Sequence, residues 1–490
     1  MKNLKQKALR GVVWTAIEKW GSQACSLVVF LVLARLLTPD TFGLVALANV
    51  FLGFMQIFLE QGFAQALIQR ENLTEKHLNA AFWSQIACGI LLAIISFVSV
   101  GFVADFFKQP KLIPILQCLS LVFIINSFSH VQKAILNRKF DFKIMAMRSL
   151  WAMVISGLVG TTMAFVGYGV WSLVAQQLTY ELVGVLVLWQ AVTWRPKLEF
   201  SQQHFQDLYS FGIHVLAFKF IKFFDRRADN LLIGYFLGEV ALGYYAISYR
   251  VLQVMTQLVA STTNQVALPA FSRLQSEPER FRQAFYRANQ FVGLIVFPTF
   301  LGAAALTPEL VVSLFGEQWT PAIRAMQILT IEGIVQSLTL FHKSVFMSLG
   351  KPSWKVKLSL VSATANVLAC ATAVRWGITA VAIAYVVSSY LVFPISQWAV
   401  NRLLKISFWS YLKQFITPTL GSLVMVGGIF VTKYFLLDVV TPKILLTIGT
   451  IVGGTIYTLS IALLDFDLFK RVFKLIRTTI FTKNKVTQST

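Results

Sequence analysis

Long apolar runs alternate with short polar segments along nearly the whole chain. A helix needs about 20 apolar residues to cross a hydrocarbon core of about 30 Å, and runs of this length recur between Pro, Gly and charge clusters. The pattern predicts an all-α polytopic membrane protein with about fourteen spanning helices. They are expected at about 11–36, 42–67, 79–106, 112–136, 142–167, 169–193, 207–236, 240–268, 286–306, 320–349, 354–375, 378–401, 411–434 and 443–464.

The composition agrees with this pattern. Hydrophobic residues make up 56% of the 490 residues, charged residues only 13%, and the mean hydropathy is +0.68. A soluble domain carries about a quarter of its residues as charged side chains. The composition therefore argues against a soluble enzyme, a nucleic-acid binder or a secreted disulfide scaffold.

The four cysteines lie inside apolar runs without the C-x-x-C spacing of metal or redox sites. We expect them to be buried small side chains. No metal site and no cofactor is predicted.

The basic residues follow the predicted topology. Lys and Arg collect in short cytoplasmic loops of membrane proteins. If the N-terminus lies inside, the inner segments hold 27 Lys and Arg and the outer loops hold six. The split predicts an N-in, C-in orientation, and it explains the net charge of +22 without nucleic acid.

Two halves of the chain resemble each other when they are superposed along the sequence. At an offset of 200 residues, Leu37, Gly43 and Ala46 coincide with Leu237, Gly243 and Ala246, and Lys19 coincides with Lys219; further matches follow at offsets of 208 and 210. Six spans per repeat place both halves the same way up, related by an axis along the membrane normal. The repeat predicts an N-terminal lobe at 1–200, a C-terminal lobe at 201–405, an added helix pair at 406–465 and a basic cytoplasmic tail at 466–490. Two such lobes suit a transporter that alternates access by rocking one lobe against the other.

Charged residues inside the predicted spans are unusually numerous. Ten of the 43 Lys and Arg and six carboxylates lie there. An ionised side chain at the bilayer centre costs at least about 2.5 kcal/mol on insertion scales, so such groups are expected to face a bundle interior or a wet cavity.

The densest cluster is KFIKFFDRRADN, residues 219–230. At 100° per residue its charges fall on one stripe, with Arg227 pointing elsewhere. One interpretation is a polar cavity for an anionic substrate. The other is a ladder of helix-joining pairs, Lys222 with Asp225 and Arg226 with Asp229.

These charges define the candidate site. Guanidinium and ammonium groups suit phosphate, so a pyrophosphate could be clamped by cations from both lobes. The candidate substrate-binding residues are Lys19, Lys133, Lys219, Lys222, Arg226 and Lys343, and the candidate ion-coupling carboxylates are Glu181, Glu332, Asp225 and Asp229. No catalytic residue is predicted.

Several stretches carry a family resemblance. LLTPDTFGLVAL, DRRADNLLIGYFLGEVALGYYAISYRV, FSRLQSEPERFRQAFYRA and FPTFLGAAALTPELVVSLFGEQWTPAIRAMQIL resemble the polysaccharide-exporter branch of the multidrug/oligosaccharidyl-lipid/polysaccharide (MOP) exporter superfamily, in particular its Wzx-like flippases similar to the colanic acid exporter. The resemblance covers about residues 5–410. It implies a two-lobed fold with twelve core helices and export of an undecaprenyl-pyrophosphate-linked oligosaccharide across a bacterial inner membrane, beside polysaccharide polymerase or export machinery.

Two other functions remain open at this point. A membrane enzyme of polysaccharide assembly, such as a polymerase or ligase, would need a catalytic motif or a large outer loop, and neither is evident. A multidrug exporter of the same superfamily would need an anionic cavity for cationic drugs, whereas cations predominate inside these spans.

One inner loop carries a further prediction. Phe281 and Phe285 lie at helical spacing among the charges of residues 273–287. The pattern predicts a short helix at the membrane interface.

Overall fold

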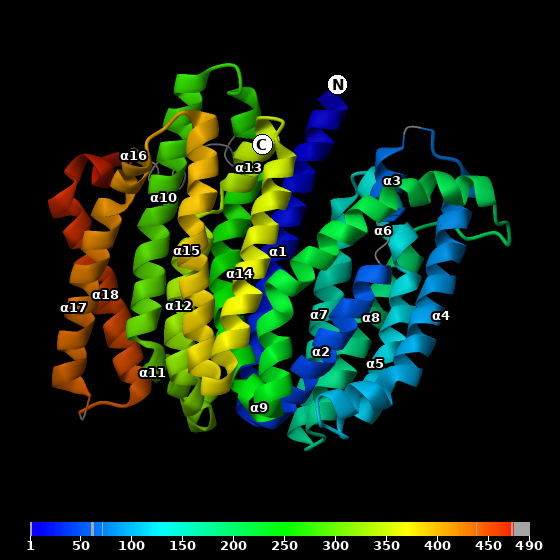
Figure 1. Ribbon diagram of the computed structural model, residues 1–490, viewed down its shortest axis with the longest axis horizontal. Helices are drawn as coiled ribbons and strands as arrows, with labels where there is room; N and C mark the ends of the chain where they lie inside the picture. The colour runs from blue at the N-terminus through cyan, green and yellow to red at the C-terminus, as the bar shows by residue number, and fades with distance from the viewer. Residues whose placement is uncertain (1, 60–62, 71, 438, 472–473, 475–490) are drawn as a thin grey trace, which may run out of the picture. The chain divides into compact units, whose positions relative to one another are not determined.

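The computed structural model describes residues 2–59, 63–70, 72–437, 439–471 and 474, with the side chains of 2–10, 12–13, 64–65, 207–218 and 260–266 left out. Nearly all of these residues are helical, and none of them forms a β-strand. Figure 1 shows the course of the helices. The all-α class predicted from the sequence is confirmed.

The first half of the chain and the helix that follows it contain nine α-helices. They are α1 (Lys2–Leu36), α2 (Pro39–Leu59), α3 (Phe63–Gln69), α4 (Glu75–Phe106), α5 (Leu112–Ser127), α6 (His130–Arg138), α7 (Phe142–Phe165), α8 (Val170–Ala191) and α9 (Gln202–Arg273).

The remainder contains nine more α-helices among the described residues. They are α10 (Pro278–Ala305), α11 (Thr307–Leu310), α12 (Ile323–Leu338), α13 (His342–Ser348), α14 (Pro352–Ala373), α15 (Ile378–Leu404), α16 (Phe408–Leu412), α17 (Ile416–Leu436) and α18 (Pro442–Leu464). Short π and 3₁₀ segments join some of them, at Val311–Phe315, Glu317–Ala322, Val374–Trp376 and Lys413–Phe415.

Local sequence explains many of the helix boundaries. Helices α2, α10, α14 and α18 each begin with a proline, whose missing N–H group is not needed in a first turn. Gly350, with φ 67°, follows the end of α13, and Gly377, with φ 93°, directly precedes α15. Both glycines adopt the left-handed region that other residues avoid.

Twelve helices of the described residues are long and apolar enough to span a membrane. Two of the fourteen predicted spans, 207–236 and 240–268, lie in α9, and they are separated there by the non-helical backbone of Gly238 (φ 82°, ψ −175°). The predicted span 320–349 is divided between α12 and α13, which have 16 and 7 residues. The protein is a multi-span membrane protein, and the count of fourteen stays a prediction.

The chain divides into two compact units, and three helices, α9, α14 and α15, continue from one unit into the other. Unit 1 comprises residues 1–250 and 356–388, and unit 2 comprises residues 251–355 and 389–490. The lobe boundaries predicted from the repeat are a separate matter, and they remain a prediction.

In unit 1, α7 packs against α1 and α8, and α5 packs against α2, α4 and α8. Buried Phe63, Phe82, Val131 and Leu188 join α3, α4, α6 and α8 in one apolar cluster.

Unit 1 also contains a very close helix crossing. A Cβ atom on Gly43 of α2 would lie 1.7 Å from the Glu239 carbonyl oxygen, and one on Gly243 would lie 1.9 Å from the Pro39 carbonyl oxygen. Only glycine permits this approach of the two backbones.

In unit 2, α10 packs against α12 and α17, and α17 packs against α18. Phe281 and Phe285 are buried here, where Phe281 stacks on Phe271 and Phe285 stacks on Tyr411. The interfacial helix predicted for residues 273–287 is therefore wrong. The spacing of the two rings was read correctly as helical, but the helix continues into a span and buries its aromatic face in protein.

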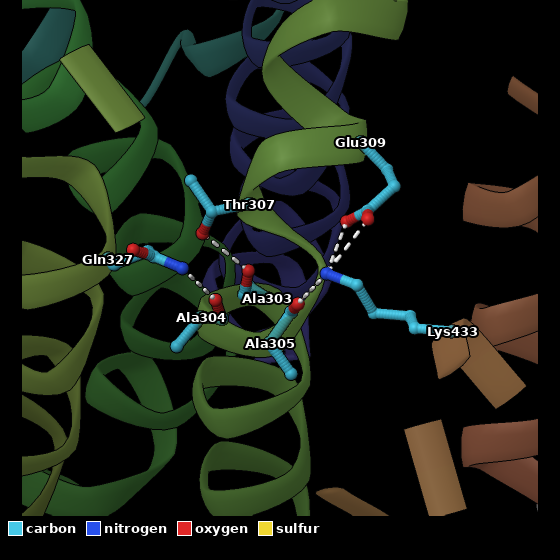
Figure 2. A network of polar contacts seen from close by, with 7 residues as sticks. All are labelled: Ala303, Ala304, Ala305, Thr307, Glu309, Gln327 and Lys433. Atoms are coloured by element: carbon cyan, nitrogen blue, oxygen red, sulfur yellow. Dashed lines mark hydrogen bonds and ion pairs between the residues drawn. The ribbon is translucent and has the colours of Figure 1, made fainter. Parts of the chain in front are cut away.

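Side chains donate hydrogen bonds to the last carbonyl groups of α10. The last carbonyl groups of a helix have no partner within the helix. Here the Ala303, Ala304 and Ala305 carbonyls accept hydrogen bonds from Thr307 Oγ1 (2.7 Å), Gln327 Nε2 (3.2 Å) and Lys433 Nζ (3.1 Å), as Figure 2 shows.

Lys433 also forms a largely buried ion pair. Its Nζ lies 2.8 and 3.1 Å from the two carboxylate oxygens of Glu309, and the two side chains are 15% and 5% exposed. The pair joins α17 to α11, next to the end of α10 (Figure 2). It connects α17 to α11 within unit 2.

Candidate substrate and ion-coupling site

Asp229 is a buried carboxylate in the spanning part of α9. It is only 1% exposed, and its Oδ2 accepts a hydrogen bond from the Tyr245 hydroxyl at 2.9 Å. The Asn230 backbone N–H donates to its Oδ1 at 2.8 Å. The ladder interpretation expected Arg226 to pair with Asp229, but the tyrosine holds this carboxylate instead.

Asp225 lies one turn before Asp229 and contacts the neighbouring helix α14. Ser362 Oγ donates to Asp225 Oδ1 at 3.2 Å, and Asn366 Nδ2 donates to the Asp225 carbonyl oxygen at 3.0 Å. Cys370 Sγ lies 3.3 Å from Asn366 Oδ1. A line of small polar side chains on α14 therefore runs along the carboxylate side of α9.

The cations of the stripe have a different environment. Lys222 and Arg226 are exposed and Lys219 is half-buried. The stripe thus has a carboxylate edge packed on α14 and a cation edge whose Lys222 and Arg226 are exposed. Because charge facing lipid tails is costly, the cation edge requires a polar or hydrated surface in front of it.

Glu181 lies in a second polar cluster of unit 1. Arg148 Nη2 is 3.6 Å from Glu181 Oε2, and the Arg148 guanidinium lies 5.6 Å from the Tyr180 ring centre. Ser149 Oγ donates to Glu18 Oε1 at 2.8 Å on α1. A Cβ atom on Gly184 would lie 2.7 Å from Arg148 Nη2, so this glycine leaves room for the guanidinium.

The other predicted residues are dispersed over both units. Lys19 on α1 is exposed and Lys133 on α6 is half-buried, both in unit 1. Lys343 on α13 is exposed, and Glu332 on α12 is 2% exposed; both belong to unit 2. Within unit 1, the structure brings Asp225 and Asp229 together on one side of α9. A shared site for all the cations stays a proposal.

Sequence reasoning missed the partners of the carboxylates. Ser362, Asn366 and Cys370 recur every four residues on an otherwise apolar helix, and this spacing was a usable signal. Tyr245, 16 residues after Asp229, gave no such signal, because the two residues meet only across the non-helical Gly238.

Comparison with known families identifies the chain. A family described as polysaccharide biosynthesis protein matches residues 32–324, more than half of the sequence. The chain belongs to this family. The polysaccharide branch of the superfamily was the expectation from its sequence motifs, and it is confirmed.

Two relatives extend the similarity over nearly the full length. The chain is 25% identical to the teichuronic acid biosynthesis protein TuaB of Bacillus subtilis, over 86% of this chain and 88% of that protein. It is also 25% identical to the succinoglycan biosynthesis transport protein ExoT of Rhizobium meliloti, over 96% and 95%.

Solved structures share the fold. The lipid II flippase MurJ in an inward closed conformation superposes with a TM-score of 0.78, at 14% identity, over 92% of this chain and 99% of that chain. An inward-facing multidrug resistance MATE transporter of the MOP superfamily gives a TM-score of 0.61 at 17% identity, over 79% and 96%. These likenesses confirm the predicted MOP-type fold.

Proposed function

We propose that this membrane protein is a flippase that moves a lipid-linked oligosaccharide across the membrane for the synthesis of a cell-surface polysaccharide. Its membership of the polysaccharide biosynthesis family supports this function. The observation that carries it is the exposed cation edge of α9, Lys222 and Arg226, near the start of the candidate span Lys219–Val259. A substrate with a lipid tail and an anionic linkage suits a membrane protein that exposes cations on a spanning helix.

The proposed anionic group is the pyrophosphate of an undecaprenyl carrier. Arg226 would hold two phosphate oxygens with its guanidinium fork, and Lys222 would add compact charge. Lys19, Lys133, Lys219 and Lys343 complete the proposed set. In this scheme the cations repel one another when the site is empty, and a bound pyrophosphate removes that repulsion and favours the closed state.

We further propose that carboxylates couple transport to an ion gradient. Asp229 is the strongest candidate, because it is buried and bonded to neutral donors, Tyr245 and a backbone N–H. Asp225, Glu181 and Glu332 are the other candidates. A buried carboxylate in a spanning helix can bind and release a proton or a small cation as its surroundings change.

Other functions have less support. TuaB and ExoT are named for polysaccharide biosynthesis, and ExoT is named a transport protein. A polymerase or ligase therefore fits this chain less well than a transporter does. A multidrug exporter is disfavoured because the exposed charges of α9 at Lys222 and Arg226 are cationic.

We propose a bacterial inner-membrane location with both termini in the cytoplasm, next to polysaccharide polymerase or export machinery. A cysteine introduced at Pro110 or Pro442 should then react with an impermeant thiol reagent added to intact cells. A cysteine at Glu277 or Pro352 should react only after permeabilisation. Labelling of the Glu277 variant in intact cells contradicts this orientation.

The function is tested in proteoliposomes that contain a fluorescent undecaprenyl-pyrophosphate oligosaccharide, whose transfer to the other leaflet changes its access to a quencher. We expect Arg226→Gln to reduce the transfer rate at least tenfold, because the bidentate phosphate contact is lost. Arg227→Gln is the matched control, since Arg227 is the next residue, is also exposed, and lies off the stripe. Equal rates for the wild type and Arg226→Gln would contradict the cationic site, and wild-type protein without transfer activity would contradict the flippase.

A further inference from the structure

Two tryptophans and an arginine meet where α14 begins and α15 ends. Trp354 of α14 and Trp398 of α15 have ring centres 6.2 Å apart, with the planes inclined at 42°. The Arg402 guanidinium, one turn after Trp398, lies 5.5 Å from the centre of the Trp398 ring. All three residues belong to unit 2.

This cluster is open to its surroundings. Trp398 is 53% exposed, and Arg402 and Lys351 are exposed too. Lys351 directly precedes α14, and its carbonyl accepts a hydrogen bond from the Trp354 N–H at 3.2 Å. We call Lys351, Trp354, Trp398 and Arg402 the Trp–Arg surface. Exposed tryptophans beside cations at the end of a spanning helix are typical of the boundary between hydrocarbon and headgroups.

The sequence that contains this surface is cationic. Residues 333–437 have nine Lys and Arg and no Asp or Glu, although Arg375 lies at the other end of α14 and Lys433 is paired with Glu309. The neighbouring start of α10 brings carboxylates, but Glu279 is paired with Arg282 at 2.6 Å, and Arg282 also donates to the Leu404 carbonyl at the end of α15. The Trp–Arg surface therefore combines positive charge with exposed aromatic area.

Another exposed tryptophan follows α15 in the sequence. The chain turns after α15, where Lys405 has φ 53° and the Ile406 N–H donates to the Asn401 carbonyl at 3.1 Å. Trp409 of α16, which follows this turn, is 68% exposed. A surface of this kind matches a ligand that presents an acyl chain and a phosphate side by side.

We propose that the Trp–Arg surface binds the phosphodiester headgroup of an anionic phospholipid. The guanidinium of Arg402 and the ammonium of Lys351 contact the phosphate, and the tryptophan rings lie at the level of the ester groups. The proposed orientation of the termini places this lipid in the cytoplasmic leaflet, but the binding itself does not depend on that orientation or on transport.

The test is retention of added lipid by purified protein in neutral detergent, measured by native mass spectrometry. Wild-type protein should retain phosphatidylglycerol in preference to phosphatidylcholine. A juxtamembrane cation contributes about 1 kcal/mol, so Arg402→Gln and Lys351→Gln should each weaken phosphatidylglycerol binding by about fivefold. Arg402→Lys should retain most of the binding.

The other end of α14 provides a matched control. Arg375 is exposed and lies next to exposed Trp376, but in unit 1 and at the opposite end of the helix. Arg375→Gln should leave phosphatidylglycerol retention unchanged. Trp398→Leu tests the aromatic part separately, and because Trp398 is half exposed, this change spares the core.

Three results would overturn the proposal. The Arg402→Gln, Lys351→Gln double variant could retain phosphatidylglycerol as the wild type does. Arg375→Gln could weaken retention equally, which would indicate general adsorption to any cation. Inorganic pyrophosphate could displace phosphatidylglycerol from the wild type at equal concentration, which would assign the surface to a free phosphate compound.

Discussion

The crossing of α2 and α9 allows one substitution to be worked out in detail, Gly43→Ala. The new Cβ would lie 1.7 Å from the Glu239 carbonyl oxygen, whereas real Cβ atoms essentially never approach another atom within 3.0 Å. The atom in the way belongs to the backbone, so no side-chain rotation relieves the contact. The two helices must separate, which strains the neighbouring hydrogen bond that Gln109 donates to the Glu239 carboxylate.

Two effects of opposite sign determine the result. Replacing glycine by alanine within a helix favours the helix by about 1 kcal/mol. Overpacking typically costs about 1–3 kcal/mol, and weakening the partly buried hydrogen bond adds about 0.5–1.5 kcal/mol. We therefore expect Gly43→Ala to lower the free energy of unfolding by about 0.5–3.5 kcal/mol.

Gly53 on the same helix is the control. A Cβ atom there would lie 3.5 Å from a carbon of the Phe223 ring, an ordinary contact, so Gly53→Ala should be neutral or stabilising by up to about 1 kcal/mol. The measurement is the free energy of unfolding from SDS titration of purified protein in mixed micelles. A Gly43→Ala variant at least as stable as the wild type would refute the reasoning.

The partner glycine extends the test. Gly243→Ala should destabilise similarly, since its Cβ would lie 1.9 Å from the Pro39 carbonyl oxygen. Both clashes are relieved by the same separation of α2 from α9. The double variant should therefore cost clearly less than the sum of the single changes.

Three further predictions concern buried or intramembrane charge. Lys433→Met should lower the free energy of unfolding by about 3–5 kcal/mol, because it leaves the Glu309 carboxylate buried without its cation. Lys443 is exposed, so Lys443→Met should stay within about 0.5 kcal/mol of the wild type in the same SDS titration. In Asp229→Asn the amide oxygen can accept from the Asn230 N–H and the amide Nδ2 can donate to the Tyr245 hydroxyl oxygen, so stability should change by less than about 1 kcal/mol. The same change should remove the response of proteoliposome transport to an imposed proton or sodium gradient, and an unchanged response excludes this carboxylate from coupling. The Lys19→Gln, Lys219→Gln double change should slow transport little more than either single change if both lysines clamp one pyrophosphate, and multiplicative losses would contradict the clamp.

The sequence was sufficient for the helical class and for most helix positions. Hydrophobic periodicity and length report the burial of a whole segment, which is why α4, α7 and α8 lie close to their predicted ranges. The same signal was too coarse where backbone geometry decides. The break predicted between residues 236 and 240 is present at the non-helical Gly238 of α9, but the predicted span 320–349 is divided between α12 and α13 at residues 339–341.

The candidate site was predictable only in its residue types. Helical periodicity grouped Asp225 and Asp229 with Lys222 and Arg226 on one stripe. It could not say which edge of the stripe packs against protein, because that depends on α14, more than 130 residues later in the chain. Phe281 and Phe285 illustrate the same limit, since amphipathic spacing does not distinguish a helix face against lipid headgroups from one against buried aromatic rings.

The glycine crossing agrees at one place with the internal repeat predicted from the sequence, while the symmetry of whole lobes stays a prediction. Gly43 and Gly243 coincide in the sequence at an offset of 200 residues, and so do Pro39 and Glu239. In the structure, Gly43 meets the Glu239 carbonyl and Gly243 meets the Pro39 carbonyl, so equivalent residues exchange equivalent contacts. This reciprocity is the pattern that a two-fold axis imposes on an interface. Glycine at both positions therefore reflects one steric requirement. A side chain on Gly43 or on Gly243 would separate the same pair of backbones.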